Sequence, residues 1–109
     1  MCLPELNIGR SNPSGAIILD HLYVFGGKGD KGFIKQIERL NLKSTNAKFE
    51  IIDIQLPNSG ASDIGIITLG VQNSSCAEIM LLGGFNGQST SNRFRFTASI
   101  GCNVFNDNS

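Results

Sequence analysis

The sequence has few of the residues on which metal sites and many enzymes depend. It contains one histidine and three cysteines, Cys2, Cys76 and Cys102. A metal site built on two imidazoles is therefore excluded, and His21 is the single candidate base for a triad of nucleophile, base and acid. The cysteines are odd in number, far apart and without a C-x-x-C pair, which argues against a disulfide framework and a zinc site. We expect reduced thiols, no metal and no cofactor.

The sequence also has no net charge and no long apolar run. Nine Lys and Arg residues balance nine Asp and Glu residues, which removes the simplest electrostatic basis for binding nucleic acid or an anionic membrane. No apolar stretch approaches the roughly 20 residues needed to cross a bilayer, and the first residues lack the basic and apolar segments of a signal peptide. These absences predict a cytoplasmic protein whose partner is another protein, with no nucleic acid and no membrane.

The composition that remains is typical of strands and turns. Thirteen glycines stand against three prolines, and 40% of the residues are hydrophobic. Isoleucine is common and alanine is scarce, which favours strands over helices. A length of 109 residues corresponds to one domain or part of one.

Two parts of the sequence resemble each other. Two apolar runs, residues 21–25 and 78–82, end in the glycine pairs Gly26-Gly27 and Gly83-Gly84 and then enter a polar loop. The pairs lie 57 residues apart (83 − 26), close to the roughly 50-residue period of some propeller repeats. An internal repeat of β-strands is the simplest interpretation.

The residues by which the spacing exceeds this period lie in one connection between strands. Residues 16–19 reach the first apolar run through two residues, Asp20 and His21, whereas residues 66–69 reach the second through nine residues, 70–78. Insertions are best tolerated in surface loops. We therefore expect an exposed two-residue turn at His21 and a long loop at 70–78.

Further strands are expected after each glycine pair. In residues 93–96, Phe and Arg alternate, as expected of a strand with one buried face. The second repeat ends in a short strand at best, because Ile100, Cys102 and Val104 alternate around Gly101. The other expected segments are the loops 28–36 and 85–92 and the strands 37–42 and 49–54.

In this order of features the chain resembles two consecutive kelch repeats. Kelch blades carry an apolar strand ending in a double glycine, a variable loop, a strand opening on an aliphatic-Glu pair and a strand opening on an aromatic residue. The first repeat has Gly26-Gly27, Ile37-Glu38 and Phe49 in these places. The resemblance covers roughly residues 10–96. It departs from the family at Phe49, where tryptophan is usual, and in the second repeat, which lacks the basic residue that Arg10 supplies in the first.

The resemblance implies an all-β fold of two four-stranded antiparallel blades of a kelch-type β-propeller, incomplete as a ring. The first blade is expected at 10–56, a second, degenerate blade at 57–105 and a polar tail at 106–109. Because propellers typically have four to eight blades, further kelch repeats or self-association are expected to complete the ring. The implied function is that of a protein-protein interaction module rather than an enzyme: a scaffold, or the substrate-recruiting part of a ubiquitin-ligase adaptor.

The resemblance also implies which residues bind the partner. In the family, the residues entering each blade and the loop after each double glycine form the face that most often holds the partner. Gly26, Gly27, Gly83 and Gly84 are expected to be structural, since adjacent glycines at a strand end allow positive φ and close approach of a neighbouring backbone. The side chains expected to bind a partner are Arg10, Lys28, Asp30, Lys31, Asn86 and Gln88.

Two other interpretations of the same residues stay open. Gly27-x-Gly29-x-x-Gly32 follows a strand, precedes a segment with helical spacing at 33–40, and would make the chain a nucleotide-binding enzyme fragment. A kelch-fold enzyme is the other alternative. The second repeat has no third glycine in register, which favours a solvated loop. Glu38 alternates with Leu40 toward one face, so we expect it to be buried against backbone amides.

Overall fold

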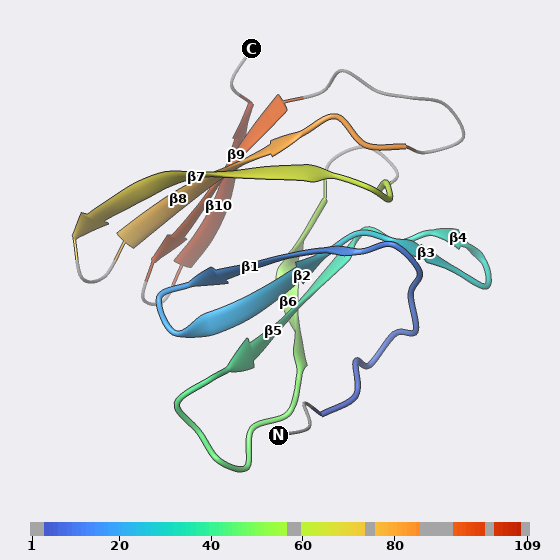
Figure 1. The fold of residues 1–109 in the computed structure, drawn as a ribbon, viewed down its shortest axis with the longest axis horizontal. Helices are drawn as coiled ribbons and strands as arrows, with labels where there is room; N and C mark the ends of the chain where they lie inside the picture. Colours follow the sequence, from blue (N-terminus) through green and yellow to red (C-terminus); the bar gives the residue numbers. More distant parts are fainter. Residues whose placement is uncertain (1–3, 57–59, 74–75, 86–92, 100–101, 108–109) are drawn as a thin grey trace.

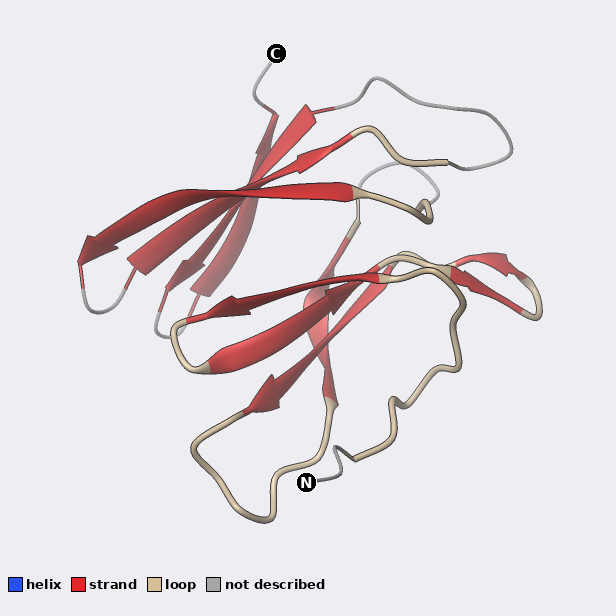
Figure 2. Cartoon of the chain, in the orientation of Figure 1, coloured by secondary structure: helices blue, strands red, loops and turns tan. Residues whose placement is uncertain are grey.

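The computed structural model describes residues 4–56, 60–73, 76–85, 93–99 and 102–107 (Figure 1). These residues form strands and connections without a helix (Figure 2). The all-β prediction is confirmed. Residues 36–41 are a strand, so the helix that a dinucleotide-binding loop would require at 33–40 is not formed.

Two four-stranded antiparallel sheets make up the fold. In each sheet, neighbouring strands are consecutive in the chain, apart from a small hairpin that interrupts the first sheet. The first sheet has the order β1-β2-β5-β6 and the second has the order β10-β9-β8-β7. The strands of the first sheet are β1 (Ser14–Ile18), β2 (His21–Phe25), β5 (Gln36–Asn41) and β6 (Glu50–Gln55). Those of the second are β7 (Gly65–Asn73), β8 (Cys76–Leu82), β9 (Arg93–Ser99) and β10 (Cys102–Asp107).

The small hairpin consists of β3 (Lys28–Gly29) and β4 (Gly32–Phe33). It forms a two-stranded sheet of its own between β2 and β5 and projects from one end of the first sheet (Figure 1). The polar loop predicted at 28–36 is therefore an ordered hairpin followed by the start of β5.

The two large sheets pack face to face around one hydrophobic core. Tyr23, Phe25 and Ile37 come from the first sheet, and Ile79, Leu81 and Phe96 come from the second. The Phe96 ring meets the Tyr23 and Phe25 rings edge-on at centroid distances of 5.5 and 5.3 Å. Edge-to-face aromatic pairs of this kind add to the free energy gained by burial alone.

A second, smaller cluster lies on the opposite face of the first sheet. Val24, Leu40 and Phe49 are buried there, and Leu6 and Ala47 pack against them. The alternation of residues 22–25 thus covers both faces of β2, which is an interior strand of its sheet.

The internal repeat is a structural one. In the first sheet, Ser11 and Lys28 exchange two backbone hydrogen bonds of 2.8 Å, and in the second, Ser62 and Phe85 do the same. Each bridge joins the residue after the glycine pair to the segment entering its sheet. The glycine pairs match in backbone geometry as well, since φ is 67° and 99° at Gly26 and Gly27, and 63° and 109° at Gly83 and Gly84.

Three details of the sequence prediction were wrong. The first hairpin turn is Leu19-Asp20, with φ of 50° and 65°, and His21 is half-buried as the first residue of β2. The loop expected at 70–78 is instead an extension of β7 and β8, paired as far as Asn73 with Cys76, because a continued ladder satisfies backbone groups that an open loop leaves to water. Strand β10 runs to Asp107 and so includes two residues of the predicted polar tail.

Candidate functional site

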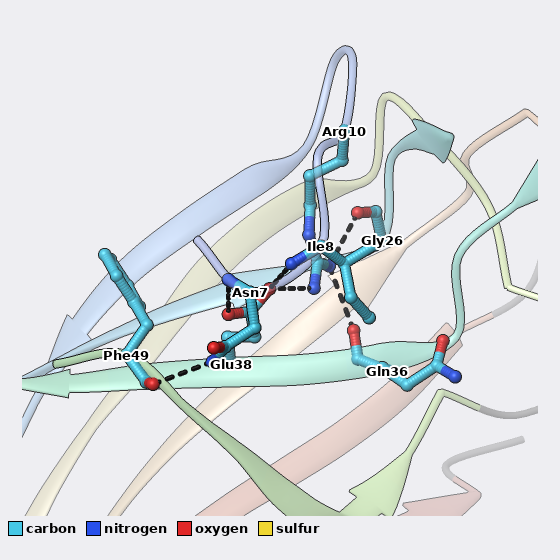
Figure 3. A network of polar contacts seen from close by, with 7 residues as sticks. All are labelled: Asn7, Ile8, Arg10, Gly26, Gln36, Glu38 and Phe49. Atoms are coloured by element: carbon cyan, nitrogen blue, oxygen red, sulfur yellow. Dashed lines mark hydrogen bonds and ion pairs between the residues drawn. The ribbon is translucent and has the colours of Figure 1, made fainter. Parts of the chain in front are cut away.

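The segment that enters the first sheet is fixed by a buried ion pair between Arg10 and Glu38. Arg10 Nη2 donates to Glu38 Oε2 at 2.7 Å, and neither side chain is exposed. Arg10 Nη1 also donates to the carbonyl oxygens of Gly26 and Gln36, both at 2.9 Å. The guanidinium therefore joins the glycine pair, the start of β5 and the entering segment at one point (Figure 3).

Glu38 holds the residues before Arg10 as well. Its Oε1 accepts a hydrogen bond from the Asn7 backbone N–H at 2.6 Å, and its Oε2 accepts one from the Ile8 N–H at 3.2 Å (Figure 3). The prediction that Glu38 is buried against backbone amides is confirmed. A buried carboxylate that meets a cation and two N–H donors is both paired and hydrogen-bonded, which is the condition for a charge to be kept inside a protein.

The hairpin β3–β4 faces this fixed segment. Lys28 pairs with Phe33 and Gly29 with Gly32, which places Asp30 and Lys31 at its tip. A Cβ on Gly29 would lie 3.3 Å from the Gly9 carbonyl oxygen and 3.1 Å from an Ile34 methyl carbon. A side chain at position 29 would therefore push the hairpin and the entering segment apart by a few tenths of an ångström.

Between the hairpin and the segment lies an open groove of about 730 Å³. One wall is formed by residues 7–11 and the other by residues 28–34, with Gln36 at the end of the second wall. The volume falls within the range of clefts that hold a small ligand or a short peptide segment.

The structure brings four of the six predicted partner-binding residues to this groove. Lys28, Asp30 and Lys31 line it and are exposed, and none of the three takes part in an ion pair within the part of the chain that the structure describes. Arg10 also lines the groove, but its guanidinium is buried against Glu38, so it fixes the wall rather than offering a charge at the rim. Asn86 and Gln88 lie outside the described residues.

Sequence reasoning missed an aromatic pair beside the groove. The rings of Phe33 and Phe85 meet edge-on at a centroid distance of 6.0 Å, and 42% of the surface of Phe85 is exposed. The Lys28 ammonium lies 5.6 Å from the Phe33 ring centroid, within the range of a cation–π interaction. The signal was present in the sequence, because each phenylalanine lies in or at the start of a loop that follows a glycine pair.

Backbone atoms of the entering segments lie very close to Gly26 and Gly27. A Cβ on Gly26 would lie 2.2 Å from the Ala61 carbonyl oxygen, and one on Gly27 would lie 2.8 Å from the Ser11 carbonyl oxygen. Gly27 N–H donates to the same Ala61 oxygen at 2.9 Å. The segment entering the second sheet therefore crosses directly over the glycine pair of the first.

The remaining candidate groups are dispersed. His21 Nδ1 lies 3.2 Å from the Leu19 carbonyl oxygen, and its ring is tilted against Tyr23. Arg39 and Glu50 form a partly exposed ion pair at 2.5 Å between β5 and β6. Partial burial lowers the pKa of Arg39, but its hydrogen bonds to Glu50 and Tyr23 outweigh this, so the pKa is raised and the side chain stays charged. Within the described ranges no three His, Cys, Asp or Glu residues gather where they could hold a metal ion.

No protein-family model matches the sequence, and a search of the curated proteins gave no match. None of the described segments forms a helix long and apolar enough to span a membrane. The groove and the repeated sheets are thus the features from which a function is inferred.

Proposed function

We propose that the chain is a pair of kelch-type blades and that it serves as a protein-interaction module, with the groove between residues 7–11 and the β3–β4 hairpin as the place where a partner segment binds. The single observation that carries this proposal is that the segment entering the first sheet and the loop after its glycine pair enclose one groove. These are the two regions that the kelch resemblance assigned to the partner.

The fold supports the blade assignment through its repetition. Both sheets are four-stranded antiparallel meanders, and both use the same backbone bridge between the entering segment and the residue after the glycine pair. In a propeller, each blade packs on its neighbours and the ring closes when further blades, in the same chain or in another copy, complete the circle. The role of scaffold or of substrate-recruiting surface in a cytoplasmic adaptor follows from that resemblance.

The chemistry of the groove favours a polypeptide partner. Two lysines and one aspartate line it without ion pairs to any other described residue, and the Phe33–Phe85 pair lies at its side. Interfaces between proteins combine a few aromatic anchors with a polar rim in this way. A partner with an apolar side chain for the aromatic pair and an acidic residue for Lys28 or Lys31 would match both features.

This proposal is tested by selecting binding peptides from a random peptide library on the immobilised chain. Affinities of the selected peptides are then measured by calorimetry for the double variant Lys28→Ala/Lys31→Ala. We expect the variant to bind about tenfold more weakly or worse, which corresponds to the loss of about 1.4 kcal/mol, because both removed charges line the groove.

The matched control removes two lysines from the other end of the first sheet. Lys43 and Lys48 are exposed and lie in the connection between β5 and β6, away from the hairpin (Figure 1). The variant Lys43→Ala/Lys48→Ala has the same change in net charge and is expected to keep full affinity. Equal losses in the two double variants, or no loss in either, would contradict the assignment of the groove.

A further inference from the structure

Gln36 lines the end of the groove with a side chain that the fold itself does not use. Its main chain is held in place, because its carbonyl oxygen accepts the 2.9 Å hydrogen bond from Arg10 and the residue pairs with Gln55 of β6. Its side-chain amide extends away from the Arg10–Glu38 pair (Figure 3). The amide makes no hydrogen bond to another residue that the structure describes. A fixed main chain therefore presents an unused amide at this point.

The other amide side chain of the groove is engaged. Asn7 Nδ2 donates to the Phe49 carbonyl oxygen at 2.7 Å, and the Asn7 backbone N–H is bound by Glu38. The entering segment thus covers β5 at Glu38 and leaves Gln36, two residues earlier on the strand, half-buried. Of the two amide side chains that line the described groove, Gln36 is the one with donors and an acceptor for a ligand.

Glycines leave the main chain open in both walls of the groove. Gly9 lies in one wall and Gly32 in the other, and a Cβ built on either would meet nothing within 4 Å. Neither the N–H nor the carbonyl group of Gly9 is hydrogen-bonded to another described residue. Glycine allows another main chain to approach closely, so the walls are suited to a ligand that has a main chain of its own.

We propose that the groove binds its partner as an extended polypeptide segment and that Gln36 hydrogen-bonds to the main chain of that segment. In an extended chain, the N–H and the C=O of one residue lie on the same edge. A glutamine amide, which has two donors and an acceptor, can bind both groups at once. The inference rests on the proposed function and adds a division of roles to it. Lys28 and Lys31 select the charge of the partner, whereas Gln36 binds groups that every polypeptide has.

The test uses a peptide selected on the immobilised chain and measures its affinity for two variants by calorimetry. Gln36→Leu removes the amide at nearly constant size and is expected to bind about tenfold more weakly. Gln55→Leu is the matched control and is expected to keep full affinity. Gln55 is the cross-strand neighbour of Gln36, but it is exposed and does not line the groove. Circular dichroism verifies that both variants keep their strands.

Backbone methylation of the peptide identifies the hydrogen bond itself. A series of peptides, each methylated at one main-chain nitrogen, is measured against the wild type and Gln36→Leu. At one position, methylation is expected to weaken binding to the wild type about tenfold. The same methylation is expected to have little further effect on Gln36→Leu, because the two changes remove the same interaction and are not additive.

Three results would overturn the inference: full affinity for Gln36→Leu, equal losses for Gln36→Leu and Gln55→Leu, or a series in which no methylation is coupled to Gln36. Each can occur while Lys28→Ala/Lys31→Ala still weakens binding, and the groove would then bind its partner through side chains alone. If the lysine variant also keeps full affinity, the assignment of the groove is wrong and this inference is wrong with it.

Discussion

Replacement of Arg10 by methionine is expected to lower the free energy of unfolding by about 3 to 5 kcal/mol. Methionine keeps most of the apolar stem but removes the cation that Glu38 meets at 2.7 Å, and both side chains are fully buried. The carboxylate is then left inside the protein without its counter-charge, and the Gly26 and Gln36 carbonyl groups lose a donor. Urea denaturation of Arg10→Met and wild type measures the difference.

The control for this prediction is Arg39→Met. Arg39 also forms an ion pair, with Glu50, but the Arg39 and Glu50 side chains are 30% and 57% exposed. Exposed pairs contribute about 0 to 1 kcal/mol because water already solvates both charges. A loss for Arg10→Met no larger than the loss for Arg39→Met would show that the buried pair is not needed for stability.

The second sheet suggests a further variant of the same experiment. Its positions equivalent to Arg10 and Glu38 are Ala61 and Phe94, since Val24 pairs with Glu38 where Leu81 pairs with Phe94. Both charges are thus missing together in the second repeat. The double variant Arg10→Ala/Glu38→Phe is expected to be more stable than Arg10→Met, because a buried ion pair replaced as a whole by apolar residues leaves no charge unpaired.

Substitution of Gly26 by alanine is expected to cost about 2 to 5 kcal/mol. The left-handed backbone, with φ of 67°, costs about 1 to 2 kcal/mol with a Cβ present. The new methyl group would lie 2.2 Å from the Ala61 carbonyl oxygen, which has to move and leave the Gly27 N–H. An unsatisfied buried donor costs a further 1 to 3 kcal/mol or so.

Two measurements make this second prediction decisive. Urea denaturation gives the loss for Gly26→Ala, and Gly9→Ala is the control, because a Cβ at Gly9 meets nothing within 4 Å and is expected to change stability by less than about 0.5 kcal/mol. Amide hydrogen exchange at Gly27 reports its hydrogen bond directly and should speed up in Gly26→Ala. Unchanged exchange together with unchanged stability would exclude the crossing of the two segments at this point.

Local patterns in the sequence were sufficient to predict most strands of the two sheets. The alternation of Phe and Arg in residues 93–96 predicted a strand, which is β9, and the alternation of Glu38 with Leu40 predicted a buried carboxylate. Both predictions depend only on the period of two along a strand. The glycine pairs marked the strand ends because few other residues accept the φ values found there.

Other features depend on contacts that no local pattern contains. Arg10 and Glu38 are 28 residues apart, and nothing near either residue specifies the other as its partner. Leu19 adopts φ of 50° in the first turn, although a leucine there is uncommon, so the sequence suggested a turn one residue later. The groove was predictable as two separate regions, but the contacts that bring its walls together, such as the bridge between Ser11 and Lys28, join segments far apart in the sequence.

The backbone bridges at the two glycine pairs hold the chain in place without depending on the side chains of the residues that they join. Lys28 and Phe85 occupy equivalent places, one charged and one aromatic, yet each is held by the same two main-chain hydrogen bonds, to Ser11 and Ser62. Main-chain bonds make no demand on the side chain that the residue carries. The surface that we propose for a partner can therefore change its side chains at these two positions while the scaffold beneath it is preserved.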